Sequence, residues 1–192
     1  MLMLNQSYKC LKKTSHYFDS YSLKTLQKSD IESVRLWRND QMDILRQNKK
    51  IDKDQQYSYF ETEVWPELSM KNPSKILLGL YLNDDLIGYG GLVYISWKEK
   101  ISEISFLLNT ERKKNEIIYA KDFSIFLKIL KKIAFKDLEI KKLYSETYEV
   151  RSFHISILEE NDFIKTKIMD KKIKIKNKIY NSIIHECTFK HE

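Results

Sequence analysis

The sequence is poor in glycine and proline, the residues that most often mark turns and linkers between domains. It contains four glycines and two prolines among 192 residues, and no stretch is rich in either. A chain of this length can bury one substantial core. We therefore expect a single domain over residues 21–192, with residues 1–20 as an N-terminal extension lying on it.

Cysteine and long hydrophobic runs are also scarce. Cys10 and Cys187 stand near opposite ends of the chain and form no CxxC pair or metal-spaced cluster. This pattern excludes a disulfide scaffold and a zinc site, so we expect no bound metal. No stretch approaches the ~18 apolar residues of a membrane span, and Met1–Leu4 is too short for a signal-peptide core. We expect a cytoplasmic protein without a transmembrane segment.

Charge, in contrast, is abundant and positive. The formal net charge is +7, but the lysines are spread in pairs along the chain rather than gathered on one segment. Nucleic-acid binders usually concentrate such charge and combine it with stacking aromatics, so we expect no nucleic-acid partner. A small nucleotide-like anion would explain the surplus. The alternative is that lysine simply covers the surface.

Hydrophobic periodicity predicts a mixed α/β (α+β) domain. Strand-like segments are expected at 21–26, 76–82, 86–95, 101–108 and 142–148, with two more between 163 and 189. Helical spacing is found at 31–38, from about 52 to the neighbourhood of Pro66, at 118–134 and at 153–161. On 101–108 the alternation places Glu103 on one side with Leu107, and Ile104 on the other side with Phe106 and Leu108.

Four short segments follow one another in an order that carries a resemblance. They are Trp37–Asp40 with a later Arg46; Ile87–Gly91; Glu103–Phe106 followed by Arg112–Lys114; and Ile157–Phe163. In this order the chain resembles the GNAT superfamily of N-acetyltransferases over about residues 21–190, in the branch of ribosomal-protein and nucleotide-sugar acetyltransferases. The resemblance implies a mixed, largely antiparallel central sheet with helices on both faces and a splayed strand pair.

The resemblance also implies an acetyl-CoA site. The pantetheine arm would lie between the Glu103 strand and 143–148, against Phe106, Leu107 and Leu108, and the pyrophosphate would lie on the following loop. That loop comprises Arg112, Lys113, Lys114, Asn115, Glu116 and Ile117. Asn115 stands where the family has its first glycine. Either Asn115 adopts a left-handed conformation and the cations compensate, or the site is degenerate and cofactor binding is weak or lost.

Five residues are candidates for acid and base chemistry. Glu103 lies on the strand where many relatives hold a catalytic glutamate, with an ordinary ion pair as the alternative. The position of the usual tyrosine acid is Leu158, and the usual asparagine is replaced by Arg151. His154 could act as base, acid or substrate contact, or be an ordinary satisfied histidine. Tyr148 is a further candidate acid, together with Tyr119 and Tyr144.

The acceptor side is expected near the first two helices. Arg38 and Arg46 are candidates for phosphate contacts, Asn39 for a sugar or amine, and Tyr89 belongs to the same implied site. Trp97 could stack on a ring or anchor the sheet.

The expected function is acetyl-CoA-dependent N-acetylation of a small amine. The leading acceptor is a nucleotide-linked amino sugar of surface-polysaccharide biosynthesis, acetylated directly in a ternary complex. Two alternatives stay open: a protein or peptide N-acetyltransferase, and a non-catalytic acyl-CoA-binding module. A homodimer is a further open alternative.

Overall fold

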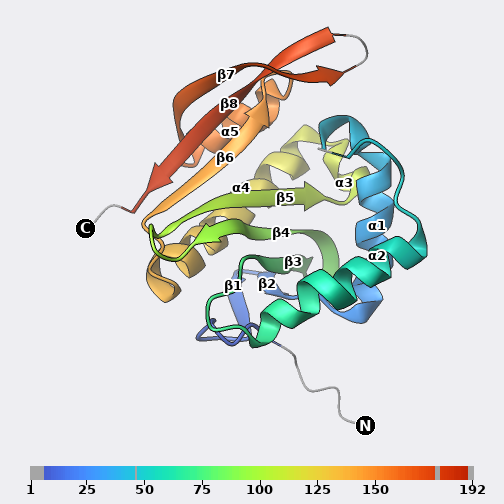
Figure 1. Cartoon of the computed structure of the whole chain (residues 1–192), viewed down its shortest axis with the longest axis vertical. Helices are drawn as coiled ribbons and strands as arrows, with labels where there is room; N and C mark the ends of the chain where they lie inside the picture. The colour runs from blue at the N-terminus through green and yellow to red at the C-terminus, as the bar shows by residue number, and fades with distance from the viewer. Residues whose placement is uncertain (1–6, 46, 176–177, 190–192) are drawn as a thin grey trace.

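The computed structural model describes residues 7–45, 47–175 and 178–189. Its centre is an eight-stranded sheet in the order β1-β2-β3-β4-β5-β6-β8-β7, in which only β5 and β6 run parallel (Figure 1). The strands are β1 (Ser15–Phe18), β2 (Tyr21–Thr25), β3 (Ile76–Leu82), β4 (Asp85–Ser96), β5 (Ile101–Leu108), β6 (Lys142–Tyr148), β7 (Ile164–Ile175) and β8 (Lys178–Thr188). The predicted mixed, largely antiparallel sheet is confirmed.

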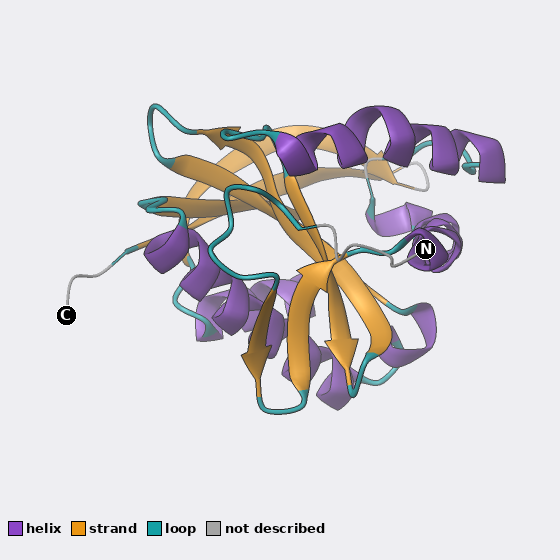
Figure 2. Ribbon diagram, turned by 90° about the horizontal axis from the view of Figure 1, so that it is seen from below, coloured by secondary structure: helices purple, strands orange, loops and turns teal. Residues whose placement is uncertain are grey.

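Helices cover both faces of this twisted sheet (Figure 2). The α-helices are α1 (Ile31–Asp40), α2 (Lys53–Tyr59), α3 (Thr110–Lys113), α4 (Glu116–Lys132) and α5 (Ser152–Glu160). Short turns of other helix types lie at Lys28–Asp30, Met42–Ile44, Phe60–Val64, Trp65–Ser69 and Ile133–Asp137. None of the described helices has the length and hydropathy needed to span a bilayer.

The helix that begins at Asp52 runs further than Pro66 suggested. Asp52 caps α2 by accepting a hydrogen bond from the Gln55 backbone N–H, 2.8 Å away. The helical path then continues through Phe60–Val64 and Trp65–Ser69, with Pro66 in the first turn of the last segment. Proline is tolerated there because a first-turn N–H has no intrahelical partner. Pro66 therefore starts a turn rather than ending the helix.

Two hydrophobic cores lie on opposite faces of the sheet. Alternation along β5 sends Leu107 into a core with α1, while Ile104 and Leu108 enter a core with α4 and α5. This is the predicted division of the strand. Burial of both faces holds the sheet between the two helical layers.

The N-terminal segment contributes to the sheet and to the core. Ser15–Phe18 pairs with β2 as the edge strand β1, and Tyr8 is 1% exposed, with its hydroxyl accepting a hydrogen bond from the Leu77 N–H. The description of residues 1–20 as an extension lying on the domain is therefore wrong for these described positions. The short strand shows no sustained alternation before the turn that leads into β2.

The glycines of β4 allow its neighbours to approach closely. A Cβ added at Gly90 would lie 2.1 Å from the Ser105 carbonyl oxygen on β5. At Gly91, where φ is +146°, an added Cβ would lie 1.9 Å from the Ile76 carbonyl oxygen on β3. A side chain at either position would displace a neighbouring strand, so both need glycine.

β5 and β6 pair over a short stretch and then separate. Pairing joins Ile101 to Lys142, Ser102 to Leu143 and Glu103 to Tyr144, and ends there. Beyond this point β6, together with β8 and β7, swings away from β5 (Figure 1). The predicted splayed strand pair is confirmed.

Candidate active site

The gap between β5 and β6 leaves strand edges available for an extended ligand. β6 stays paired with β8 over seven positions, from Lys142 to Tyr148, so its other edge borders the gap. Residues 104–108 of β5 are likewise paired only with β4. A molecule with alternating amide groups could pair with such edges as an added strand does.

The gap opens into a cavity of about 700 Å³, within the range usual for small-molecule sites. It extends from the gap to α1 and α2 and collects side chains from most of the chain. Of the predicted site residues, those that line it are Arg38, Tyr89, Glu103, Phe106, Tyr148 and His154. The structure thus brings together the candidate catalytic residues Glu103, Tyr148 and His154 with two candidate substrate contacts.

Glu103 stands where β5 and β6 begin to part. It is half-buried and is the last β5 residue paired with β6. It lies on the same side of β5 as Leu107, which packs in the α1 core, and so it faces the α1 side of the sheet. This position suits a base that must reach an amine held in the cavity.

A second carboxylate, Glu146 of β6, also lines the cavity. Its Oε1 accepts a hydrogen bond of 2.5 Å from the Ser182 hydroxyl. Because Tyr144 pairs with Glu103 and side chains two residues apart share a face, both carboxylates lie on the same face of the sheet. Glu146 was missed from the sequence, because alternation along 142–148 relates it to Tyr144 and only the pairing with β5 relates it to Glu103.

His154 of α5 is buried and neutral at pH 7. Burial, followed by the nearby Arg151, His185 and Lys113, holds the pKa of His154 well below its ordinary 6.5. Its Nδ1 lies 2.8 Å from the hydroxyl of Tyr119. A role that requires a protonated imidazole at neutral pH is therefore disfavoured. Leu158, where relatives hold the tyrosine acid, is fully buried in the core with α4.

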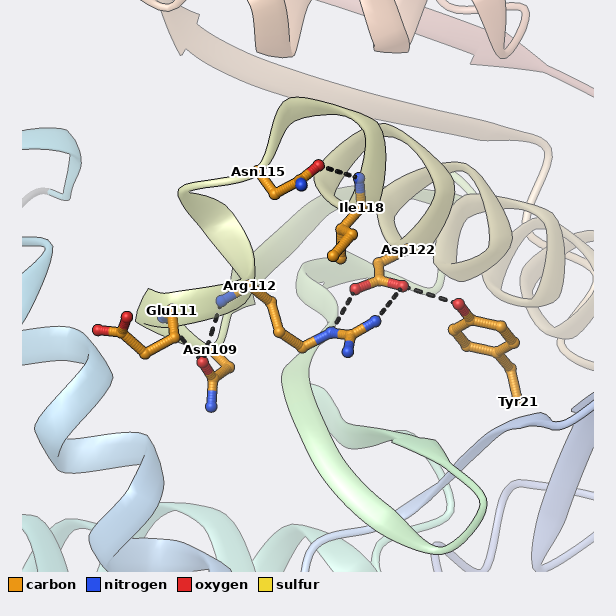
Figure 3. Close-up of polar contacts among 7 residues, drawn as sticks. All are labelled: Tyr21, Asn109, Glu111, Arg112, Asn115, Ile118 and Asp122. Atoms are coloured by element: carbon orange, nitrogen blue, oxygen red, sulfur yellow. Dashed lines mark hydrogen bonds and ion pairs between the residues drawn. The ribbon is translucent and has the colours of Figure 1, made fainter.

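The loop between β5 and α4 is stabilised by two asparagine caps (Figure 3). Asn109 accepts hydrogen bonds from the N–H groups of Glu111 and Arg112, at 2.9 and 3.2 Å. Asn115 accepts one from the Ile118 N–H at 3.1 Å and is the N-cap of α4, with φ −101° and ψ 112°. Asn115 is therefore extended, and the left-handed reading of it is wrong.

Arg112 turns inward from the same loop (Figure 3). Its Nε and Nη2 donate to the carboxylate of Asp122, at 2.7 and 3.0 Å, and Asp122 is fully buried. Tyr21 of β2 donates to the same carboxylate at 2.8 Å. Burial, and then the bond to Asp122, raises the pKa of Tyr21 to about 12. The Arg112 guanidinium is thus engaged in holding α4 against the sheet.

The remaining loop residues differ in position. Lys113 is half-buried, and burial lowers its pKa, as does Arg151 nearby, while Asp43 opposes the shift. Lys114 is exposed and pairs with Glu111 at 2.7 Å. Glu116 and Ile117 begin α4, and Ile117 is 82% exposed. The N–H groups of these two residues lie in the first helical turn, where an anion can bind.

Of the residues predicted to bind the acceptor, some line the cavity and others make structural contacts elsewhere. Arg38 donates to the Tyr89 hydroxyl at 3.0 Å within the cavity. Asn39 instead clamps the chain after α1, bonding the carbonyl and the N–H of Ile51, both at 2.8 Å. Trp97 donates to the Pro73 carbonyl at 2.7 Å and packs against the core. Arg46 lies outside the described residues.

The residues present fit acetyl-CoA as a ligand of the gap. Unpaired strand edges suit its amide-bearing arm, the start of α4 offers backbone N–H groups, and Lys113 adds positive charge beside that helix end. Leu107 and Leu108 are buried behind the gap, whereas Phe106 lines it. No cluster suited to a metal is found among the residues that the structure describes.

A family comparison agrees with this geometry. The model of the acetyltransferase (GNAT) domain matches residues 23–184. The chain belongs to the GNAT acetyltransferase family. This GNAT protein is accordingly an N-acetyltransferase with acetyl-CoA as its co-substrate, and the predictions of family, fold class and enzyme class are confirmed.

Solved structures share the fold of this GNAT protein. Spermidine N-acetyltransferase from Vibrio cholerae, in complex with CoA and spermine, is 13% identical with a TM-score of 0.75, covering 89% of this chain and 96% of that one. A chimera of the Vibrio cholerae enzyme SpeG and hSSAT is 12% identical with a TM-score of 0.73, covering 88% and 95%. No curated protein sequence matches the chain.

Proposed function

We propose that this protein transfers an acetyl group from acetyl-CoA to a primary amine of a small molecule that carries a second positive charge. The observation that carries the proposal is the pair of carboxylates, Glu103 and Glu146, on one face of a cavity of about 700 Å³. Carboxylates in a partly dry site attract ammonium groups more strongly than they would in water. The cavity therefore favours a diamine or polyamine.

The acceptor nitrogen must be a neutral amine when it attacks the carbonyl carbon, because an ammonium nitrogen has no lone pair. Acetyl-CoA, when bound, supplies an acetyl group activated as a thioester. Glu103 accepts a proton from the attacking amine, directly or through one water, as the new N–C bond forms. The C–S bond then breaks and CoA leaves as the thiolate, which takes a proton from water. Glu146 holds the second ammonium group of the acceptor. Arg38 keeps the Tyr89 side chain oriented on the wall of the cavity.

The structural neighbours provide support of a different kind. One of them holds CoA and spermine, so the same fold can hold a polyamine acceptor. At 13% identity this shows the fold and leaves the acceptor of this chain as a proposal.

A nucleotide-linked amino sugar of surface-polysaccharide biosynthesis is the second candidate acceptor. Arg38 and Lys75 both line the cavity and could meet phosphate oxygens. The carboxylates would repel a diphosphate, and this repulsion places the amino sugar second. A peptide amine remains as a further alternative acceptor.

An amine panel tests the acceptor class. Release of free CoA thiol is measured with acetyl-CoA and a polyamine, a monoamine, a nucleotide-linked amino sugar and a peptide. We expect kcat/KM for the polyamine to exceed that for the monoamine at least roughly tenfold, because one charge-assisted hydrogen bond contributes about that factor.

Glu146→Gln serves as the matched variant of this experiment. It should remove most of the preference for the polyamine while retaining monoamine turnover. A preference for the amino sugar would overturn the polyamine proposal in favour of the second candidate. Thermal stabilisation by acetyl-CoA without turnover of any amine in the panel would overturn the proposed acceptor class.

A further inference from the structure

Tyr119, in the first turn of α4, connects two residues at the start of the α5 region. Its hydroxyl lies 2.8 Å from Nδ1 of His154 and accepts a hydrogen bond of 3.3 Å from Nη2 of Arg151. Tyr119 is 6% exposed and His154 is 8% exposed. The three side chains thus form a hydrogen-bonded chain largely shielded from water.

The hydrogen-bond donors and acceptors of these three side chains determine where their protons lie. A guanidinium only donates, so Arg151 occupies one lone pair of the Tyr119 oxygen. The single Tyr119 proton is then directed at Nδ1 of His154. If Nδ1 carried a proton instead, the Tyr119 oxygen would accept two bonds and its own proton would be buried without an acceptor. Such an unmade bond is costly.

The surroundings also keep the His154 ring neutral. The charged and titratable groups that act on it are Arg151, Lys113 and His185, all of them basic. A protonated imidazole would add a buried positive charge beside these groups. A neutral ring with Nδ1 as acceptor carries its proton on Nε2.

Aromatic stacking fixes the ring at the wall of the gap. His154 stacks on Phe123 with a centroid distance of 4.4 Å and an interplanar angle of 14°. Phe123 in turn stacks on Phe106 of β5 at 4.6 Å. Both His154 and Phe106 line the cavity. The His154 ring is therefore held at the wall of the cavity, close to Phe106 of β5.

We propose that Tyr119 is a positioning residue that, held by Arg151, fixes His154 as the neutral Nε2–H tautomer, and that this N–H donates a hydrogen bond to the arm of the acyl donor in the gap. The second half of the proposal rests on the function proposed above. The first half concerns the unliganded protein alone. It also gives a role to Arg151, which replaces the usual asparagine of relatives.

The tautomer can be measured directly by long-range ¹H–¹⁵N correlation of the His154 ring at neutral pH. We expect an unprotonated, acceptor-type Nδ1 and a protonated Nε2 in the wild type. In Tyr119→Phe, which keeps the ring but removes the hydroxyl, the two nitrogens should move towards averaged shifts. A protonated Nδ1 in the wild type, or an unchanged spectrum in a folded Tyr119→Phe, would overturn the positioning role.

Binding of CoA, measured by calorimetry, tests the second half of the proposal. His154→Gln places an amide donor near the position of Nε2, and His154→Asn places one near Nδ1. We expect the Kd for CoA to change less than about twofold in His154→Gln, and to rise roughly tenfold in His154→Asn and Tyr119→Phe. Equal affinities of the two His154 variants would contradict the donor role.

The two experiments separate the two proposals. Absence of CoA binding to the wild type would overturn the function and the donor role together, while the tautomer measurement would still decide the role of Tyr119. If Tyr119→Phe fails to fold, the wild-type spectrum and the His154 pair decide the outcome. Binding of CoA by the expected residues without turnover would overturn only the proposed function.

Discussion

The two edges of β5 behave differently, although they belong to one eight-residue strand. Along one edge β5 pairs with β4 from Gly88–Leu108 to Ser96–Ile101, while along the other it pairs with β6 at three positions. We call the edge paired with β4 the closed edge and the edge that faces the gap the open edge. The closed edge needs glycine, because a Cβ at Gly90 would collide with the β5 backbone. The open edge needs no special residue in β5. It exists because β6 is held elsewhere, by β8 along its whole length.

The comparison shows that the gap between β5 and β6 is produced by the elements around β5 rather than by the residues of β5 itself. On the α4 side of the open edge, the rings of Phe106, Phe123 and His154 stack across the space between β5 and α5. The loop after β5 is tied down by Arg112, which pairs with buried Asp122. Separate changes to the open edge, the loop and the closed edge should therefore have separable effects on activity and stability.

The largest expected effect is on catalysis, from a change at Glu103, where the open edge of β5 begins. Glu103→Gln should lower kcat about 1000-fold with little change in stability, because it removes the group proposed to accept the amine proton. Initial rates of thiol release with the preferred amine measure this. Glu146→Gln is the matched control and should raise KM more than it lowers kcat. Full activity of Glu103→Gln would remove the base assignment.

Breaking the ion pair behind the loop should cost stability. Arg112→Met leaves the Asp122 carboxylate buried without its cation, so we expect the free energy of unfolding to fall by about 4 kcal/mol. Lys114→Met is the control, since its pair with Glu111 is exposed and should contribute less than about 1 kcal/mol. Denaturant titration compares the two. Equal losses would mean that Arg112 does not hold α4 in place.

The closed edge can be disturbed without touching the cleft. Gly90→Ala should lower the free energy of unfolding by about 3 kcal/mol, because the added methyl group meets the Ser105 carbonyl oxygen of β5. At Gly79 the added Cβ meets only the side chains of Tyr81 and Leu86, which can shift, so Gly79→Ala should cost less. Chemical denaturation of both variants gives the difference. A milder effect at Gly90 would contradict the close approach of β4 and β5.

The smallest predicted effect is a dependence of stability on pH. Burial is the main reason why the pKa values of His154 and His16 lie below 6.5, so the unfolded chain binds protons at a higher pH than the folded chain. Stability is therefore retained above about pH 6.5 and decreases as the pH falls below it, by at most about 1.4 kcal/mol per pH unit for each histidine.

Histidine variants assign this pH dependence. His154→Gln should remove the part of the pH dependence that arises beside the open edge of β5. His16→Gln should remove the part that arises at β1, at the far end of the sheet. Unfolding curves measured between pH 7.5 and about pH 5 test both. A stability profile of His154→Gln that follows the wild type would mean that His154 protonates normally in the folded protein.

The sequence predicts the two strands of this comparison well. The ranges expected from the sequence, Ile101–Leu108 and Lys142–Tyr148, have the same first and last residues as β5 and β6. It also places Glu103 on the correct side of β5. Local pattern suffices here because every second side chain of β5 enters one of two cores. The short strand β1 has too few residues to establish such a pattern.

The interactions that build the rest of the site join distant residues and could not be read locally. Asp122 is only ten residues from Arg112, but its other partner, Tyr21, lies 101 residues earlier in the chain. The sequence therefore does not show that Asp122 is buried, and Arg112 reads as a free loop cation. Asparagine is common both in the left-handed backbone conformation and as a helix N-cap. Only the position at which α4 begins shows that Asn115 is the cap. Glu146 shares a face with Glu103 only because β5 and β6 are parallel neighbours.

Hydrogen–deuterium exchange with and without acetyl-CoA tests most directly the claim that the acyl donor lies in the gap. Bound donor should slow exchange in peptides over 104–108, 145–148 and the start of α4, because those backbone groups gain partners. Peptides over Ile164–Asp170 in β7, on the far edge of the sheet, should be unchanged. Slower exchange elsewhere, with no change along the open edge of β5, would contradict the account.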